Sequence, residues 1–200
     1  MAPGGTRPAL CLLPVGDRCL DLCLGGAVGA SHLLSRDHTC ALMGVVPPLE
    51  SLRPWELSFS TRQHGVSLAT LFRRSGRSGP TLLVVRDTGG HVFGCYSADG
   101  WRLSTRFYGN GQTCVFQLEP HRVAWPWDSS PGPTKNDFYM HGTPERLVVG
   151  ASAGGQCAIY LDGDLLRGSS GACSTFGSPC LASNNEFTIQ HVEVWQVAVG

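Results

Sequence analysis

Hydrophobic and polar positions follow a strand-like alternation through most of this chain. It begins in "WELSFS" at Trp55–Ser60 and returns in short runs separated by Gly- and Pro-rich turns. The run Leu82–Val85 is apolar without alternation, which indicates a strand covered on both faces. Asp87-Thr88-Gly89-Gly90 follows it, and this is a strong hairpin signal. The remaining predicted strands are Thr113–Leu118, Phe138–His141, Arg146–Val149, Cys157–Leu161 and Phe187–Val197.

Helical patterns occur only before residue 77. In "SHLLSRDHTCALMGVVPPL", Ser31 is a plausible N-cap, and Pro47-Pro48 would end the helix. Its predicted inward residues are Leu33, Leu34, Cys40, Ala41 and Met43. A second helix is predicted in "HGVSLATLFRRSG", where Gly76 follows an apolar stripe made of Val66, Leu68, Leu71 and Phe72.

Together these patterns predict a mainly β fold, a two-sheet antiparallel β-sandwich flanked by a few short helices in its N-terminal part. The 26 glycines suit this fold, because tight β-turns need positive φ angles. We expect residues 1–30 to form a poorly ordered extension and residues 31–200 to form one domain.

Composition excludes several functional classes. Fifteen basic residues balance fifteen acidic ones, so no net charge favours a nucleic-acid or anionic-membrane partner. The apolar stretch near the N-terminus is interrupted by Pro14, Asp17 and Arg18, so neither a signal peptide nor a membrane span is expected. Nine cysteines without a C-x-x-C pair indicate reduced thiols in an intracellular protein. The cytoplasm is the expected compartment, with the nucleus and mitochondrion left open.

Two glycine-containing stretches could carry chemistry but are better explained as turns. Gly109-Asn110-Gly111 lacks a third glycine, and the strand "TCVFQL" follows it where a phosphate loop needs a helix N-terminus. Asp162-Gly163-Asp164 could bind a cation or act as an acid–base pair, but it lacks the further oxygen ligands of a calcium loop. Because apolar runs flank it, a hairpin turn is favoured. No metal and no cofactor is expected.

The last predicted strand leaves two interpretations open. Strict alternation in "FTIQHVEVWQV" buries His191 and Glu193 among apolar neighbours, which is costly unless they have partners. A β-bulge near Gln190 would instead bury Val192 and Val194 and expose His191 and Glu193.

A cysteine nucleophile is the other catalytic candidate. Cys173 would need a histidine base, and His64 or His191 could be imagined in that role. No nucleophile elbow surrounds Cys173, so a structural or redox-sensitive thiol is favoured. His64-Gly65 is predicted to form the entry turn of the second helix.

Four motifs in one order resemble the TLDc domain family. They are "PWELSFSTRQHGVSLATLFRR", "PTLLVVRDTGGHVFGCYS", "FYGNGQTCVFQL" and "LDGDLLRGSSGACSTFGSPCLASNNEFTIQHVEVW". Gln112 stands where the family usually has Glu, Cys114 where it has an aromatic residue, and Gly177 where Asn is common. The positions that match recurring family residues are Gly65, Gly109, Gly111, Asp162, Asp164, Cys173 and Glu193.

The resemblance implies a β-sandwich with short flanking helices and a role in protecting cells against oxidative damage. It also implies a protein partner, with subunits of the vacuolar proton-pumping ATPase as the candidate, and it supplies no catalytic residues. The expected function is therefore a monomeric, non-enzymatic protein-binding module. The alternative is an enzyme or peroxide-reactive protein that uses the Cys173 thiol or a His191/Glu193 acid–base pair.

Overall fold

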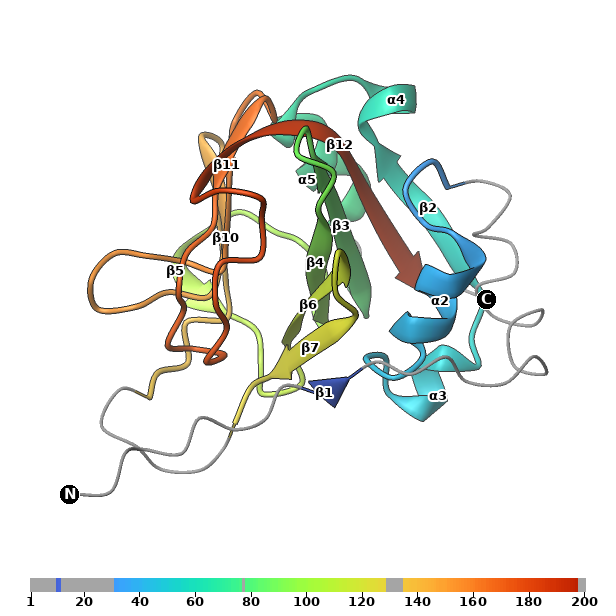
Figure 1. Cartoon of the computed structure of the whole chain (residues 1–200). Coiled ribbons are helices and arrows are strands. Elements are labelled where there is room, and N and C mark those ends of the chain that lie inside the picture. The colour runs from blue at the N-terminus through green and yellow to red at the C-terminus, as the bar shows by residue number, and fades with distance from the viewer. Residues whose placement is uncertain (1–9, 12–30, 77, 129–134, 198–200) are drawn as a thin grey trace.

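A computed structural model describes residues 10–11, 31–76, 78–128 and 135–197, and this part of the chain is mainly β (Figure 1). Its twelve strands form one hydrogen-bonded system in which every pairing is antiparallel. The described helices are α2 (Arg36–Leu42), α3 (Pro48–Ser51), α4 (Thr61–His64) and α5 (Leu68–Ser75). The strands are β1 (Leu10–Cys11), β2 (Trp55–Ser60), β3 (Thr81–Asp87), β4 (Val92–Ser97), β5 (Ser104–Tyr108), β6 (Cys114–Glu119), β7 (Val123–Pro126), β8 (Met140–Thr143), β9 (Arg146–Val149), β10 (Ile159–Asp162), β11 (Arg167–Ser169) and β12 (Glu186–Val197).

The strands make two layers that share β12, so the predicted two-sheet sandwich is confirmed. One layer has the order β1-β7-β6-β4-β3-β12-β2, and the other runs β12-β11-β10-β9-β8-β5. The first residues of β12 pair with β11, and the later ones pair with β3 and β2. The register shifts between Ile189 and His191, where the strand passes from one layer to the other. Figure 1 shows β12, in red, spanning both layers.

The larger sheet is covered on both faces, as the unbroken apolar run in β3 predicted. Leu83 and Val85 pack into the core between the two layers, whereas Leu82 and Val84 face a second core beneath α2. All four side chains are fully buried. A strand buried on both faces loses the polar alternation that would mark one face as solvent-exposed.

Helix α5 confirms most of the second helical prediction. The Ser67 side chain caps it by accepting a hydrogen bond from the Thr70 N–H, and Leu68 and Leu71 are fully buried. Val66 is 51% exposed, so its assignment to the buried stripe was wrong. The reason is that it precedes the cap and therefore does not follow the helical period.

The first helix is shorter than the pattern predicted, and its N-cap is different. Ser35 caps α2: its Oγ accepts from the His38 N–H, and His38 Nδ1 accepts from the Ser35 N–H. The assignment of Ser31 as the cap was therefore wrong. The helix also ends at Leu42, ahead of the two prolines, and Pro48 opens α3.

Most predicted strands are present within two residues of their expected bounds, but β5, β7 and β11 were not predicted. These three strands have three to five residues and at most one fully buried side chain each, so they leave little periodic signal.

The prediction for residues 1–30 lies outside the described residues except for β1, which pairs with β7. No helix among the described residues is long and apolar enough to cross a membrane.

Candidate functional site

The bulge in β12 decides how its polar residues are placed. Val192 and Val194 are fully buried and face the core between the layers, as the bulge interpretation predicted. His191 is only partly exposed, and Glu193 is 1% exposed, so the expectation that the bulge would expose Glu193 was wrong. The residues that precede α2 explain the difference, because they fold over this carboxylate.

Three donors satisfy the buried Glu193 carboxylate. The Ser31 hydroxyl donates to Oε2 at 2.6 Å, and the His32 N–H donates to Oε1 at 2.8 Å. The Trp195 indole N–H donates to Oε2 at 3.2 Å. Ser31 Oγ also accepts from the N–H groups of Leu33 and Leu34. A buried carboxylate bonded in this way can remain in an apolar setting, and it holds the chain before α2 against the sheet.

We call residues 31–42, from Ser31 to the end of α2, the covering segment. A second contact anchors it further along, because His38 Nε2 lies 2.9 Å from Glu119 Oε1 at the end of β6. Nearby, Arg122 donates to the Asp37 carboxylate at 3.3 Å. The covering segment is therefore held by polar contacts at β12 and at β6, on either side of the apolar residues beneath it.

His191 and Glu193 are neighbours but do not form an organised acid–base pair. In the described part of the chain, no hydrogen bond joins the two side chains, and Glu193 is fully engaged by its three donors. Burial lowers the pKa of His191, and the positive charges of Arg62 and Arg86 lower it further, while the Glu193 charge acts in the opposite direction. His191 is therefore mainly uncharged near neutral pH.

The two aspartates form the predicted turn between β10 and β11. Asp162 accepts hydrogen bonds from the backbone N–H groups of Leu166 and Arg167, and Asp164 accepts a weaker one from Leu166. Burial and the neighbouring Asp164 raise the pKa of Asp162. Among the described residues, no group of three His, Cys, Asp or Glu side chains could hold a metal ion.

The aspartate pair and the His191/Glu193 pair would have to share bonding partners to act as one polar site. Their hydrogen-bond partners do not overlap: Asp162 bonds within its own turn, whereas Glu193 bonds to the covering segment and to Trp195. The described hydrogen bonds therefore do not join the four residues into one polar network.

The glycine and histidine candidates have structural roles. Gly109 has a φ of +110° at the predicted turn, and a Cβ on Gly111 would lie 2.7 Å from the Trp127 ring. Strand β6 follows this turn, as expected for a corner of a sheet. His64 Nδ1 accepts from the Ser60 N–H at 3.0 Å, and Gly65, with a φ of +79°, ends α4 shortly before α5 begins.

Among the described residues, no hydrogen bond joins the Cys173 thiol to His64 or to His191, and Cys173 belongs to the apolar core. It is 2% exposed, and its backbone pairs with Ser178. A Cβ on Gly150 would lie 2.6 Å from its sulfur, so the thiol is packed against the chain. Among the other cysteines, burial raises the pKa of Cys157 to about 11 and that of Cys114 to about 12. These cysteines behave as core side chains and do not resemble activated nucleophiles.

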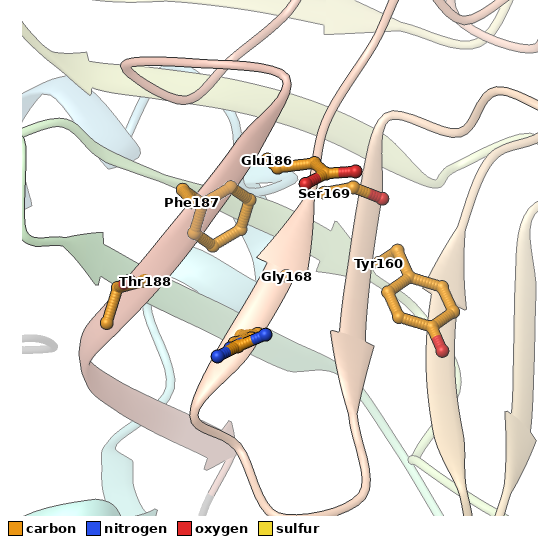
Figure 2. Close-up of a pocket in the computed structure, with 7 residues that line it drawn as sticks. Tyr160, Gly168, Ser169, Glu186, Phe187 and Thr188 are labelled. Atoms are coloured by element: carbon orange, nitrogen blue, oxygen red, sulfur yellow. The ribbon is translucent and has the colours of Figure 1, made fainter.

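Two surface depressions were not visible in the sequence. One, of about 540 Å³, lies over β10, β11 and β12, and Figure 2 shows Tyr160, Ser169 and Glu186 on these neighbouring strands. Its lining is mixed, with the exposed charged residues Arg167 and Glu186 beside the aromatic rings of Tyr160 and Phe187. Tyr160, Ser169 and Glu186 are separated in sequence. They lie side by side because Ser169 of β11 pairs with Tyr160 of β10 and with Glu186 of β12.

The second depression, of about 480 Å³, is apolar, and we call it the α5 groove. Arg73 and Arg102 lie among its lining residues, and none of the described lining residues is acidic. Leu103, one of the lining residues, is 57% exposed. Its apolar lining is Ala69, Phe72, Gly76, Trp101, Leu103 and Pro144. An exposed apolar surface of this kind is typical of a site that binds another molecule.

These features define a class: a two-layer β-sandwich with a covered outer sheet face, an apolar surface groove and no assembled catalytic set among the described residues. The family model of the TLDc domain matches residues 28–198. The chain therefore belongs to the TLDc domain family, as the four sequence motifs predicted.

Curated relatives agree with this assignment. Over 166 residues, 82% of this chain, it is 39% identical to Oxidation resistance protein 1 of Bos taurus and 37% identical to that of Homo sapiens. It is 34% identical to Nuclear receptor coactivator 7 of Homo sapiens over the same length. The matched part is only 17–18% of these relatives, so the chain spans less than a fifth of their length.

Proposed function

We propose that this chain is a non-enzymatic protein-binding module that contributes to resistance against oxidative stress. Its similarity to proteins named for oxidation resistance supports the second part of this proposal. The α5 groove carries the first part, because it is an apolar surface that no described element covers. The expected setting is the cytoplasm, with the chain acting as a monomer.

The groove favours a partner segment of defined chemistry. Arg73 and Arg102 provide positive charge beside an apolar floor, so an amphipathic segment with apolar anchors and acidic neighbours would complement it. The Arg102 guanidinium also lies 4.0 Å from the centre of the Tyr108 ring, and the Tyr108 hydroxyl bonds to the Arg102 backbone. These contacts orient one side of the groove before a partner arrives.

The cytosolic sector of the vacuolar proton-pumping ATPase is the partner we propose to test first. Purified full-length chain, immobilised and exposed to cell extract, is expected to retain ATPase subunits that mass spectrometry identifies. Leu103→Asp places a charge beside the groove and should reduce recovery at least about tenfold. The matched control is Leu49→Asp, because Leu49 is 80% exposed on α3 and away from the groove.

The outcomes test three parts of this proposal separately: the partner, the binding surface and the role in oxidative stress. Failure of the unaltered chain to retain any ATPase subunit would contradict that partner. Equal recovery with Leu103→Asp and Leu49→Asp would contradict the groove as the binding surface. Equal peroxide survival of cells with and without the chain would contradict the role in oxidative stress.

The peroxide-reactive alternative requires an accessible thiol of low pKa, and burial of Cys173 argues against it. We expect alkylation of the native protein at Cys173 to be slow at neutral pH and to become fast only after unfolding. The measurement is the alkylation rate across pH, read by mass spectrometry. Rapid modification of native Cys173 well below pH 8 would instead support a reactive thiol.

A further inference from the structure

Four basic side chains from different elements gather beside the bulge in β12. Arg86 of β3 and His191 of β12 are cross-strand partners. Arg62 belongs to α4, whose first residue, Thr61, accepts a hydrogen bond from the Val192 N–H at 3.1 Å. His32 comes from the covering segment. The His32 N–H donates to Glu193, two residues after His191, so these contacts bring the four side chains to one place, and the charges of Arg62, Arg86 and His32 all act on His191.

The nearby carboxylate does not pair with either arginine. Among the described residues, Glu193 is the only acidic group whose charge acts on His191, and its oxygens accept from Ser31, from the His32 backbone and from Trp195. In the described part of the chain, neither Arg62 nor Arg86 forms a side-chain hydrogen bond or ion pair. One carboxylate therefore faces two guanidinium groups and two imidazoles, which leaves an excess of positive charge.

Arg86 provides a second, independent observation that favours a bound anion. Its Nε atom is buried and has no hydrogen-bond partner. Buried polar atoms without partners are few in folded proteins, and each calls for an explanation such as a bound ion. A charged donor left in this state lowers stability, and so does the repulsion between neighbouring cations.

We propose that Arg62, Arg86, His191 and His32 form a binding site for a phosphate-type oxyanion. Such an anion offers several acceptor oxygens to guanidinium donors, and it would neutralise the excess charge. The adjacent Glu193 opposes any anion, so binding depends on both arginines acting together. A bound anion would connect the covering segment to α4, β3 and β12.

The test is a titration of the ¹⁵N-labelled full-length chain with inorganic phosphate at constant ionic strength, followed by NMR. We expect saturable shifts at residues 32, 62, 86 and 191, with a dissociation constant in about the millimolar range. Arg86→Gln should weaken binding at least about tenfold. The matched control is Arg167→Gln, since Arg167 is an exposed arginine on the other layer, and it should bind as the unaltered chain does.

Two results would overturn the site. One is a linear, unsaturated response to phosphate, and the other is equal affinity in Arg86→Gln and in the unaltered chain. If Arg86→Gln does not fold, Arg86→Lys is the replacement, because it keeps the charge but loses the Nε donor. It should then bind more weakly than the unaltered chain.

Further titrations distinguish the source of the phosphate group. Vesicles of phosphatidylcholine with a phosphoinositide are compared with the soluble inositol phosphate headgroup and with inorganic phosphate. Vesicle binding that the soluble headgroup displaces, and that Arg86→Gln weakens, assigns a lipid headgroup. Binding of the soluble anions without vesicle binding assigns a free phosphate compound, and binding of none of the three overturns the proposal.

Discussion

Two carboxylates in this protein are satisfied in opposite ways. Asp162 accepts hydrogen bonds from backbone groups four and five residues further along its own turn. Glu193 accepts from Ser31 and His32, which lie more than 160 residues earlier in the chain. The aspartate needs only its local turn, whereas the glutamate depends on the covering segment folding over the sheet.

Because of this difference, we expect the Asp162 and Glu193 carboxylates to contribute differently to the free energy of unfolding. Replacement of Asp162 affects an exposed turn, where water can take over lost hydrogen bonds. Removal of the Glu193 carboxylate leaves buried donors without an acceptor, and each such donor costs roughly 1–3 kcal/mol. Four measurements can test whether the contrast is as large as these contacts imply.

The largest expected effect is that of Glu193→Ala. It removes the acceptor of three donors and should lower the free energy of unfolding by about 3 kcal/mol. Urea denaturation measures this change. Glu186→Ala, at the exposed start of the same strand, is the control and should change stability by less than about 0.5 kcal/mol. Similar losses in the two variants would show that the carboxylate is not a key anchor.

Ser31→Ala tests the other side of the same contact. The change removes one donor to Glu193 and the acceptor of the Leu33 and Leu34 N–H groups, so we expect a loss of about 1–2 kcal/mol. Hydrogen exchange at Leu33 and Leu34 should also accelerate. Ser104→Ala, which removes hydrogen bonds only within an exposed strand end, serves as control. Unchanged exchange at Leu33 and Leu34 would contradict the anchoring role of Ser31.

The third prediction concerns the pKa of His191, measured by NMR. Burial and then Arg62 and Arg86 hold it below 6.5, so Arg86→Gln should raise it and Glu193→Gln should lower it. Because the folded-state pKa is depressed, protonation favours the unfolded state, and His191 reduces stability as the pH falls below 6.5. An unshifted pKa in Arg86→Gln would place that guanidinium too far away to act.

The smallest effect is expected for Asp162→Asn. Asparagine retains an oxygen that can accept from the Leu166 N–H, so stability should change by less than about 0.5 kcal/mol. The folded-state pKa of Asp162 is raised above 3.8, so its favourable contribution is present below that pH and is lost as the pH rises through the folded pKa. Parallel pH profiles for the two proteins would contradict this raised pKa.

The elements with strong local patterns were predictable. Short stretches of neighbouring residues were enough to predict the apolar run in β3, the hairpin after it and the buried stripe of α5. The short strand β11 was missed because it consists of only three residues, Arg167–Ser169, between two longer neighbours. Its strand geometry comes from pairing with β10 and β12.

The candidate site shows even more clearly that local sequence patterns do not predict contacts between distant segments. A bulge at the right place could be proposed from sequence, and it placed Val192 and Val194 correctly. The burial of Glu193 could not be deduced, because it depends on which distant segment covers that face. For the same reason Ser31 looked like a helix cap, when its hydroxyl in fact bonds to Glu193.

The sequence by itself determined the family, the mainly antiparallel fold and the local roles of the turn residues, because these depend on short-range patterns of burial and backbone geometry. Tertiary structure alone decided what Glu193 and Arg86 do. Their environments arise where the covering segment, α4, β3 and β12 meet, and contacts between distant segments leave no periodic trace in the sequence. Whether a charged side chain is solvated, anchored or left with an unpaired donor is settled by those contacts.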